Sequence, residues 1–180
     1  ADALARAGYL VIHPNFRNWP PSDSGPSEFR TGQAVDVLHL IGLSQKQGGQ
    51  AGPLAKADPQ RIGLWGHSMG GGITQRVITV SDDVDAAVLY GAMSGDEALN
   101  HQRILYFTNG ANGLWEQAPP DEALQRISPI NFLERVAAAV SIHHGDRDDQ
   151  VPLAWSDDLC QRLRDLEKPV ECFTRSEEHT

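Results

Sequence analysis

The pattern of apolar and polar residues along this chain predicts strands that alternate with helices. Short apolar runs bounded by turn residues predict five strands, at residues 9–16, 61–68, 84–93, 137–145 and 169–174. The segments between them predict helices at residues 28–45, 70–81 and 153–167. Because apolar strands separated by helices form a parallel sheet that helices cover on both faces, the pattern predicts an α/β fold.

Residues 94–135 interrupt this alternation. The segment contains Pro119-Pro120 together with Gly110 and Gly113, and it is predicted to be mostly helical or irregular. In this architecture an insertion commonly lies over the strand ends and shapes a substrate pocket, so we expect a pocket-covering segment here. A surface excursion with no role at the site is equally compatible with the sequence.

Composition narrows the class of protein further. The length of 180 residues suits one domain, and the net charge of −9 comes with no basic stripe, which excludes nucleic acid and anionic membranes as expected partners. No apolar run approaches the roughly 20 residues of a membrane-spanning helix. Cys160 and Cys172 form neither a disulfide framework nor a metal-type motif, so we expect two ordinary thiols, no metal and no organic cofactor.

The stretch Gly66-His67-Ser68-Met69-Gly70 lies where a predicted strand meets a predicted helix. A serine in such a sharp turn adopts a strained backbone conformation and presents its hydroxyl as a nucleophile. Side chains two residues before and after it would collide, so Gly66 and Gly70 are predicted to be required. The N–H of Met69, at the positive end of the helix, is predicted to stabilise an oxyanion. The alternative is a plain structural turn.

A serine nucleophile needs a base and an acid that orients the base. In this kind of sheet the acid follows a later strand than the serine. Asp146, Asp148 and Asp149 all follow the predicted strand 137–145, and their spacing does not choose among them.

Four segments, in this order, resemble the catalytic domain of prolyl-oligopeptidase-type serine peptidases and their α/β-hydrolase relatives: NFR, DPQRIGLWGHSMGGG, SPINFLERV and HHGDRDDQVP. The resemblance implies an α/β-hydrolase fold with a mostly parallel sheet and helices on both faces. The family pattern H-G-x-x-D-x-x-V-P falls on His144, Gly145, Asp148, Val151 and Pro152. This match selects Asp148 as the acid.

The resemblance also assigns roles to other residues. Arg17 resembles a family arginine near the active-site loops and is expected to organise structure rather than catalyse. His143 and His144 match strand-end positions and are expected to be structural. His67 adjoins the nucleophile, but the turn directs it elsewhere, and we expect a packing role.

The chain departs from the family pattern at both ends, so we interpret residues 1–174 as a partial catalytic domain that lacks the first strands and the last helix. Relatives have a catalytic histidine after a strand like 169–174. Here RSEEHT follows, which also equals the translation of a common sequencing-adapter sequence, and we interpret 175–180 as a non-native tail. The alternative is that His179 is the base.

Together these patterns predict a serine hydrolase in which Ser68 forms an acyl-enzyme. The resemblance favours a serine-type peptidase with peptide substrates. A carboxylesterase of the same fold is the alternative, because a fold does not determine its substrate. A non-catalytic binding protein of this fold is a further hypothesis.

Overall fold

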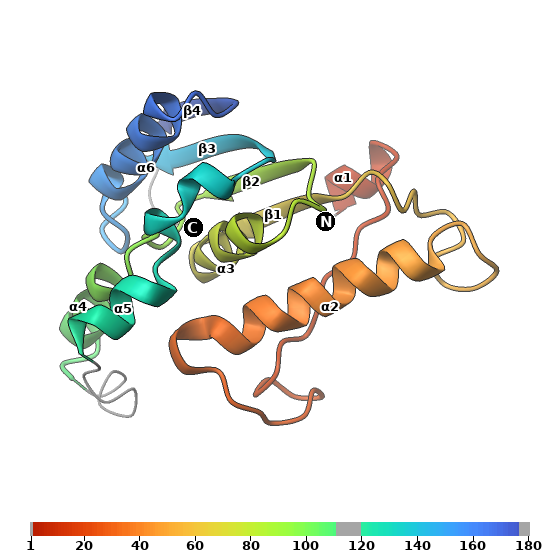
Figure 1. Ribbon diagram of the computed structural model, residues 1–180, viewed down its shortest axis with the longest axis horizontal. Helices are drawn as coiled ribbons and strands as arrows, with labels where there is room; N and C mark the ends of the chain where they lie inside the picture. Colours follow the sequence, from red (N-terminus) through yellow and green to blue (C-terminus); the bar gives the residue numbers. More distant parts are fainter. Residues whose placement is uncertain (1, 111–119, 177–180) are drawn as a thin grey trace. The chain divides into compact units, whose positions relative to one another are not determined.

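The computed structural model describes residues 2–110 and 120–176, and it divides into two compact units, residues 1–62 and 63–180. The first unit contains α1 (Asp2–Arg6), the short 3₁₀ helix η1 (Glu28–Arg30) and the long helix α2 (Thr31–Gln47) (Figure 1). The helix predicted at residues 28–45 is confirmed by η1 and α2.

The strand predicted at residues 9–16 is wrong, because this segment has neither strand nor helix structure. The apolar side chains of residues 9–12 are exposed, and Tyr9 and Leu10 retain 64% and 44% of their accessible surface. A strand needs a neighbour for its backbone N–H and C=O groups. No strand within the described part of the first unit offers this segment a hydrogen-bond ladder.

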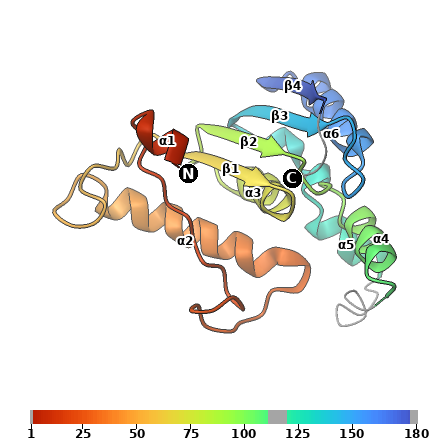
Figure 2. The same ribbon diagram turned by 180° about the vertical axis from the view of Figure 1, so that it is seen from behind.

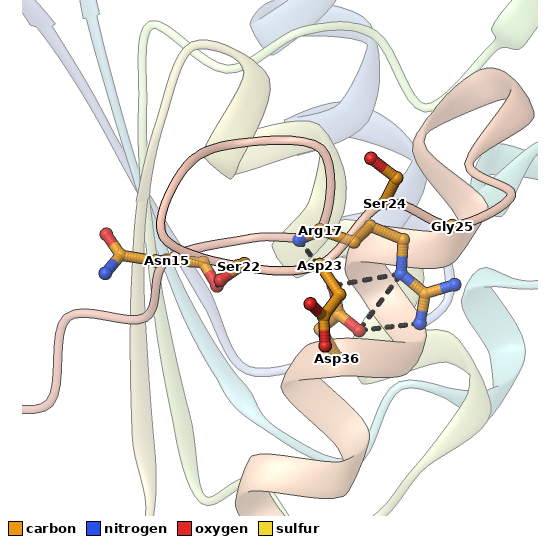
Figure 3. A pocket seen from close by; sticks show the side chains of 7 residues that line it. All are labelled: Asn15, Arg17, Ser22, Asp23, Ser24, Gly25 and Asp36. Carbon is orange, nitrogen blue, oxygen red and sulfur yellow. Dashed lines mark hydrogen bonds and ion pairs between the residues drawn. The ribbon is translucent and has the colours of Figure 1, made fainter.

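Arg17 organises the loops of the first unit around α2. Its guanidinium donates to both carboxylate oxygens of Asp36, at 2.6 Å and 3.1 Å, and to the carbonyl of Pro26 at 2.9 Å (Figure 3). The hydrogen bonds from Arg17 hold the pKa of Asp36 below its ordinary value. Gly32 permits this packing, since a Cβ there would lie 2.7 Å from Cδ of Arg17. Arg17 therefore has the structural surroundings that the sequence led us to expect.

The second unit contains a parallel four-stranded sheet in the order β1 (Gly63–His67), β2 (Ala86–Tyr90), β3 (Ala139–Gly145) and β4 (Val170–Arg175). Four of the five predicted strands are thus confirmed. The register aligns His67, Tyr90, His143 and Phe173 across the sheet. The carboxyl ends of the strands consequently lie at one edge.

Two helices connect these strands, α3 (Met69–Val80) between β1 and β2 and α6 (Leu153–Asp165) between β3 and β4. Right-handed crossovers in a sheet whose strands follow chain order place both helices on one face. Val77 of α3 and Leu163 of α6 are buried with Leu89 and Ile142 of the sheet. The strands alternate between buried and more exposed residues, and Trp65 on the other face is 60% exposed.

The segment 94–135 forms α4 (Glu97–Phe107), α5 (Asp121–Ile127) and the 3₁₀ helices η3 (Pro129–Asn131) and η4 (Leu133–Arg135). In Figure 2, α4 and α5 lie beside each other toward the end of the sheet to which the strand arrows point. The observed helices agree with the predicted mostly helical character of this segment.

A buried ion pair fastens α3 to this segment. The guanidinium of Arg76 lies 2.5 Å from a carboxylate oxygen of Glu97, and their side chains are only 11% and 4% exposed. Arg76 also donates to the carbonyl of Ile127 at 2.6 Å, and the N–H of Glu97 donates to the hydroxyl of Ser128 at 2.9 Å. The helix that follows β1 is therefore tied to the start of α4 and to the end of α5.

Cys160 of α6 and Cys172 of β4 form a disulfide bond, with their Cα atoms 6.4 Å apart. The expectation of two ordinary thiols is therefore wrong. The spacing of 12 residues does not indicate the pairing in the sequence. It arises because the crossover brings α6 back against the strand that follows it.

We expect that replacing both cysteines, Cys160→Ala with Cys172→Ala, lowers the free energy of unfolding by about 3 kcal/mol, since the cross-link closes a short loop in the unfolded chain. Urea denaturation without reductant measures this difference. Unmodified protein in reductant is the control and should lose a similar amount. Equal unfolding midpoints for oxidised protein and the double variant would contradict a disulfide in this position.

Candidate active site

Ser68 occupies the single-residue turn between β1 and α3. Its backbone has φ 50° and ψ −115°, a conformation that a residue with a side chain rarely adopts. Its N–H donates to the carbonyl of Tyr90, and its carbonyl accepts from the N–H groups of Met93 and Gly71, each at 3.0 Å. The bonds to Tyr90 and Met93, at and just after the end of β2, and the bond from Gly71 of α3 hold the strained turn in place.

The glycines beside Ser68 differ in how closely they are packed. A Cβ at Gly66 would lie 2.3 Å from the carbonyl oxygen of Gly70 and 2.6 Å from the hydroxyl of Thr74. A Cβ at Gly71 would lie 2.4 Å from Cβ of Ala92. A Cβ at Gly70, by contrast, would meet no atom within 4 Å in the described part of the chain. The predicted collision therefore exists at Gly66, whereas the prediction that Gly70 is needed for the same reason is wrong.

We expect Gly66→Ala to lower the free energy of unfolding by about 2 kcal/mol or more, because backbone atoms must move to admit the methyl group. Gly70→Ala is the matched control and should be neutral or stabilising by up to about 1 kcal/mol, since alanine favours a helix over glycine. Thermal denaturation of both variants provides the comparison. Equal effects of the two substitutions would contradict the close packing at Gly66.

Met69 is the first residue of α3, a helix of 12 residues. The first N–H groups of an α-helix have no acceptor within the helix and carry its positive partial charge. The backbone N–H of Met69 follows Ser68 directly, so its position is compatible with the predicted oxyanion role. That role stays a prediction.

Asp148 differs from its two neighbours in burial and in hydrogen bonding. Its side chain is 1% exposed, and one carboxylate oxygen accepts the N–H groups of Gln150 and Val151 at 2.9 Å and 2.8 Å. Asp146 and Asp149 are exposed. A carboxylate that orients a catalytic base has to be held in one position, so the structure favours Asp148 among the three candidates.

His144 is fully occupied by neighbouring groups. Its Nδ1 lies 2.6 Å from the hydroxyl of Ser156, and its Nε2 lies 2.9 Å from the carbonyl of Val151 and 3.2 Å from a carboxylate oxygen of Asp148. A ring with both nitrogens engaged and 1% exposure does not serve as a mobile base. The contact between His144 and Asp148 is a feature that the sequence analysis missed.

The other two histidines near the strand ends also have structural surroundings. Nε2 of His143 lies 3.0 Å from the hydroxyl of Ser141, and Nδ1 lies 3.2 Å from the guanidinium of Arg175. The ring of His67 packs against the ring of Tyr90 with centroids 5.5 Å apart. These surroundings agree with the structural and packing roles expected from the sequence.

Ser68 and the loop of Asp148 belong to the same edge of the sheet. Ser68 follows β1 and Asp148 follows β3, and the two strands flank β2, which puts their axes about 10 Å apart. A base between the two groups could come from the chain that follows β4. His179, the candidate in this sequence, lies outside the described residues.

The insertion contacts the acid loop through Arg103 of α4. Its guanidinium donates to the carbonyls of Asp149 and Gln150, at 2.5 Å and 2.9 Å, and lies 4.4 Å from the centre of the Phe107 ring. This contact brings the segment 94–135 beside the loop that carries Asp148. The sequence contained no signal for it beyond the expected position of the insertion.

Residues 2–110 and 120–176 offer neither a cluster of metal ligands nor a membrane-spanning helix. Within these ranges, His, Cys, Asp and Glu side chains do not gather in groups of three that could hold a metal ion. None of the helices in the same ranges combines the length and the apolar character needed to cross a membrane.

The parallel sheet and the strained serine turn define a protein of the α/β-hydrolase fold. The sequence profile of the prolyl oligopeptidase family matches residues 53–179, which is more than half of the chain. The chain therefore belongs to the prolyl oligopeptidase family.

Three known proteins illustrate the similarity. The uncharacterized peptidase YuxL of Bacillus subtilis is 28% identical over 181 residues, which are 94% of this chain and 26% of YuxL. The puromycin-hydrolyzing peptidase of Mycobacterium tuberculosis superposes with a TM-score of 0.65 at 24% identity, over 86% of this chain and 23% of the peptidase. The esterase Pf2001 of Pyrococcus furiosus superposes with a TM-score of 0.74 at 17% identity, over 98% of this chain and 65% of the esterase. The chain thus spans about a quarter of the two peptidases, and the two superpositions show the fold alone.

Proposed function

We propose that the protein is a serine hydrolase that works through an acyl-enzyme, with Ser68 as nucleophile and Asp148 as the orienting acid. The observation that carries this proposal is the backbone of Ser68, which is held at φ 50° and ψ −115° by hydrogen bonds to residues at and just after the end of β2. Such strain persists only where the surrounding structure maintains it, and it is typical of a working nucleophile. The buried, hydrogen-bonded carboxylate of Asp148 after β3 is the second support.

In this mechanism Oγ of Ser68 attacks the carbonyl carbon of the substrate while a histidine accepts its proton. The negative charge on the carbonyl oxygen is stabilised by the N–H of Met69. The tetrahedral intermediate then collapses, the histidine gives its proton to the leaving group, and the acyl group stays on Ser68. Water, activated by the same histidine, releases the acid and restores the serine.

We place the base after β4, where a side chain could reach the space between Ser68 and the loop of Asp148. His179 is one candidate for this base. The other is a histidine in a longer form of the chain, in which the residues that follow Thr174 differ from RSEEHT.

A peptide is the substrate that we favour. Membership of the prolyl oligopeptidase family and the sequence similarity to the peptidase YuxL support this choice. A carboxylesterase is the second candidate, because the esterase Pf2001 superposes over nearly the whole chain. The two candidates share the same nucleophile and differ in the leaving group, an amine or an alcohol.

A fluorophosphonate probe tests the proposal on this chain and on any longer form that contains it. We expect labelling of Ser68 in the unmodified protein and none in Ser68→Ala, whereas Ser94→Ala, a serine elsewhere in the second unit, should label normally. Absence of labelling in every form that contains the chain would favour a non-catalytic protein of this fold. Cleavage of alanine or proline p-nitroanilides supports the peptidase, while turnover of p-nitrophenyl acetate alone supports the esterase.

A further inference from the structure

A chain of three buried polar side chains runs from α6 to the acid loop. Ser156 of α6, His144 of β3 and the carboxylate of Asp148 are in successive contact, at 2.6 Å and 3.2 Å. Ser156 is 6% exposed and His144 is 1% exposed. Groups so deeply buried are kept only when each has a hydrogen-bond partner.

The partners of His144 fix where its proton lies. The carbonyl of Val151, 2.9 Å from Nε2, only accepts hydrogen bonds, so Nε2 carries the hydrogen. Nδ1 of the neutral ring is then an acceptor, and it receives the hydroxyl hydrogen of Ser156. The carbonyl of Val151 and the carboxylate of Asp148, both acceptors, thereby select the tautomer, and the hydroxyl of Ser156 holds the other side of the ring.

Both oxygens of the Asp148 carboxylate are engaged by this arrangement. One accepts the backbone N–H groups of Gln150 and Val151, and the other lies 3.2 Å from Nε2 of His144. The backbone contacts come from the loop itself and would move with it. His144, on a strand, and Ser156, on a helix, connect the carboxylate to rigid elements instead.

We propose that Ser156 and His144 are positioning residues: Ser156 holds the ring of His144, and the ring in turn fixes the orientation of Asp148. This inference rests on the proposed role of Asp148 as the acid of the hydrolase. Loss of the Ser156 hydroxyl leaves Nδ1 of His144 buried without its donor. The ring then turns to find another partner for Nδ1, and the carboxylate loses its contact with the sheet.

The chain offers a matched control for this arrangement. Ser141 and His143 form a similar pair on the same strand, with the hydroxyl 3.0 Å from Nε2 of the ring. His143 contacts Ser141 and Arg175 and stacks on the ring of Phe173. Ser141→Ala therefore removes an equivalent hydroxyl without disturbing the path to Asp148.

Kinetics with the substrate that the unmodified protein turns over form the first arm of the test. We expect Ser156→Ala to lower kcat about tenfold with KM within about twofold, the size of effect expected from one hydrogen bond in a buried network. Ser156→Thr retains the hydroxyl and should recover most of the rate, and Ser141→Ala should match the unmodified protein. Equal rates for Ser156→Ala and Ser141→Ala would overturn the proposal.

Nitrogen NMR of protein labelled with ¹⁵N in histidine is the second arm, with the His144 signal assigned from its loss in His144→Gln. We expect a ring protonated at Nε2 in the unmodified protein and a shifted Nδ1 resonance in Ser156→Ala, where this nitrogen has lost the hydroxyl. A ring protonated at Nδ1, or one unaffected by Ser156→Ala, would overturn the proposal. The NMR measurement needs no turnover. If the fluorophosphonate probe fails to label Ser68, the proposed function is contradicted, but the NMR result still decides whether Ser156 and His144 position Asp148.

Discussion

Asp148→Asn is expected to lower kcat/KM by roughly 10³–10⁴-fold while the protein stays folded. The amide preserves the size of the side chain and can still accept the N–H groups of Gln150 and Val151. It lacks the charge that stabilises an imidazolium, and it presents a donor where the base expects an acceptor. Steady-state kinetics with whichever p-nitroanilide or p-nitrophenyl ester the unmodified protein turns over measure the rate, and a circular dichroism spectrum shows whether the variant is folded.

The neighbouring aspartates supply the controls for this substitution. Asp146→Asn and Asp149→Asn each remove one negative charge from the same loop, but both side chains are exposed. We expect each to keep its rate within about threefold of the unmodified protein, since exposed charges interact weakly. If Asp146→Asn or Asp149→Asn lost most of its kcat/KM while Asp148→Asn stayed active, that neighbour would be the acid instead of Asp148.

Glu97→Gln is expected to produce the largest loss of stability, about 3–5 kcal/mol, because it removes the carboxylate that faces the buried guanidinium of Arg76. The pair joins α3, which begins at the nucleophile, to α4 and to the end of α5. Unfolding in urea measures the difference. The loss should appear as a lower midpoint with little change in slope.

Two further variants test the cause of this loss. Arg76→Met combined with Glu97→Leu removes both charges and should recover much of the stability, since apolar groups can replace a buried pair. Asp158→Asn breaks the pair of Asp158 with Arg162, whose side chains are more than half exposed, and should cost less than about 1 kcal/mol. If Glu97→Gln and Asp158→Asn lowered the free energy of unfolding by similar amounts, burial of the Arg76–Glu97 pair would not be the cause of the loss.

The sequence predicted the elements of the second unit well because each apolar run there finds a neighbour in the sheet. Strands 61–68, 84–93, 137–145 and 169–174 and helices 70–81 and 153–167 all correspond to observed elements. The run at residues 9–16 is also rich in apolar and β-branched residues. It forms no strand, because strand formation depends on a neighbouring strand as well as on composition.

Other features depend on distances through space that a sequence does not contain. The disulfide between α6 and β4 and the contact of Arg103 with the acid loop each depend on how a crossover or an insertion folds back. The choice of Asp148 came from a family pattern, and the burial that supports it became visible only in the structure. Gly70 was misjudged because a motif implies that all of its glycines are crowded, whereas only Gly66 faces backbone atoms at contact distance.

At Ser68 the backbone conformation that the proposed function needs also lowers the stability of the fold. A residue held in such a conformation costs of order 1–3 kcal/mol, which glycine would recover because it has no side chain to oppose that geometry. Random mutagenesis that selects for heat resistance alone should therefore enrich Ser68→Gly, and the surviving proteins would be hardier and inert. Retention of serine at this position in heat-selected variants would consequently be a sign that turnover, rather than folding, was under selection.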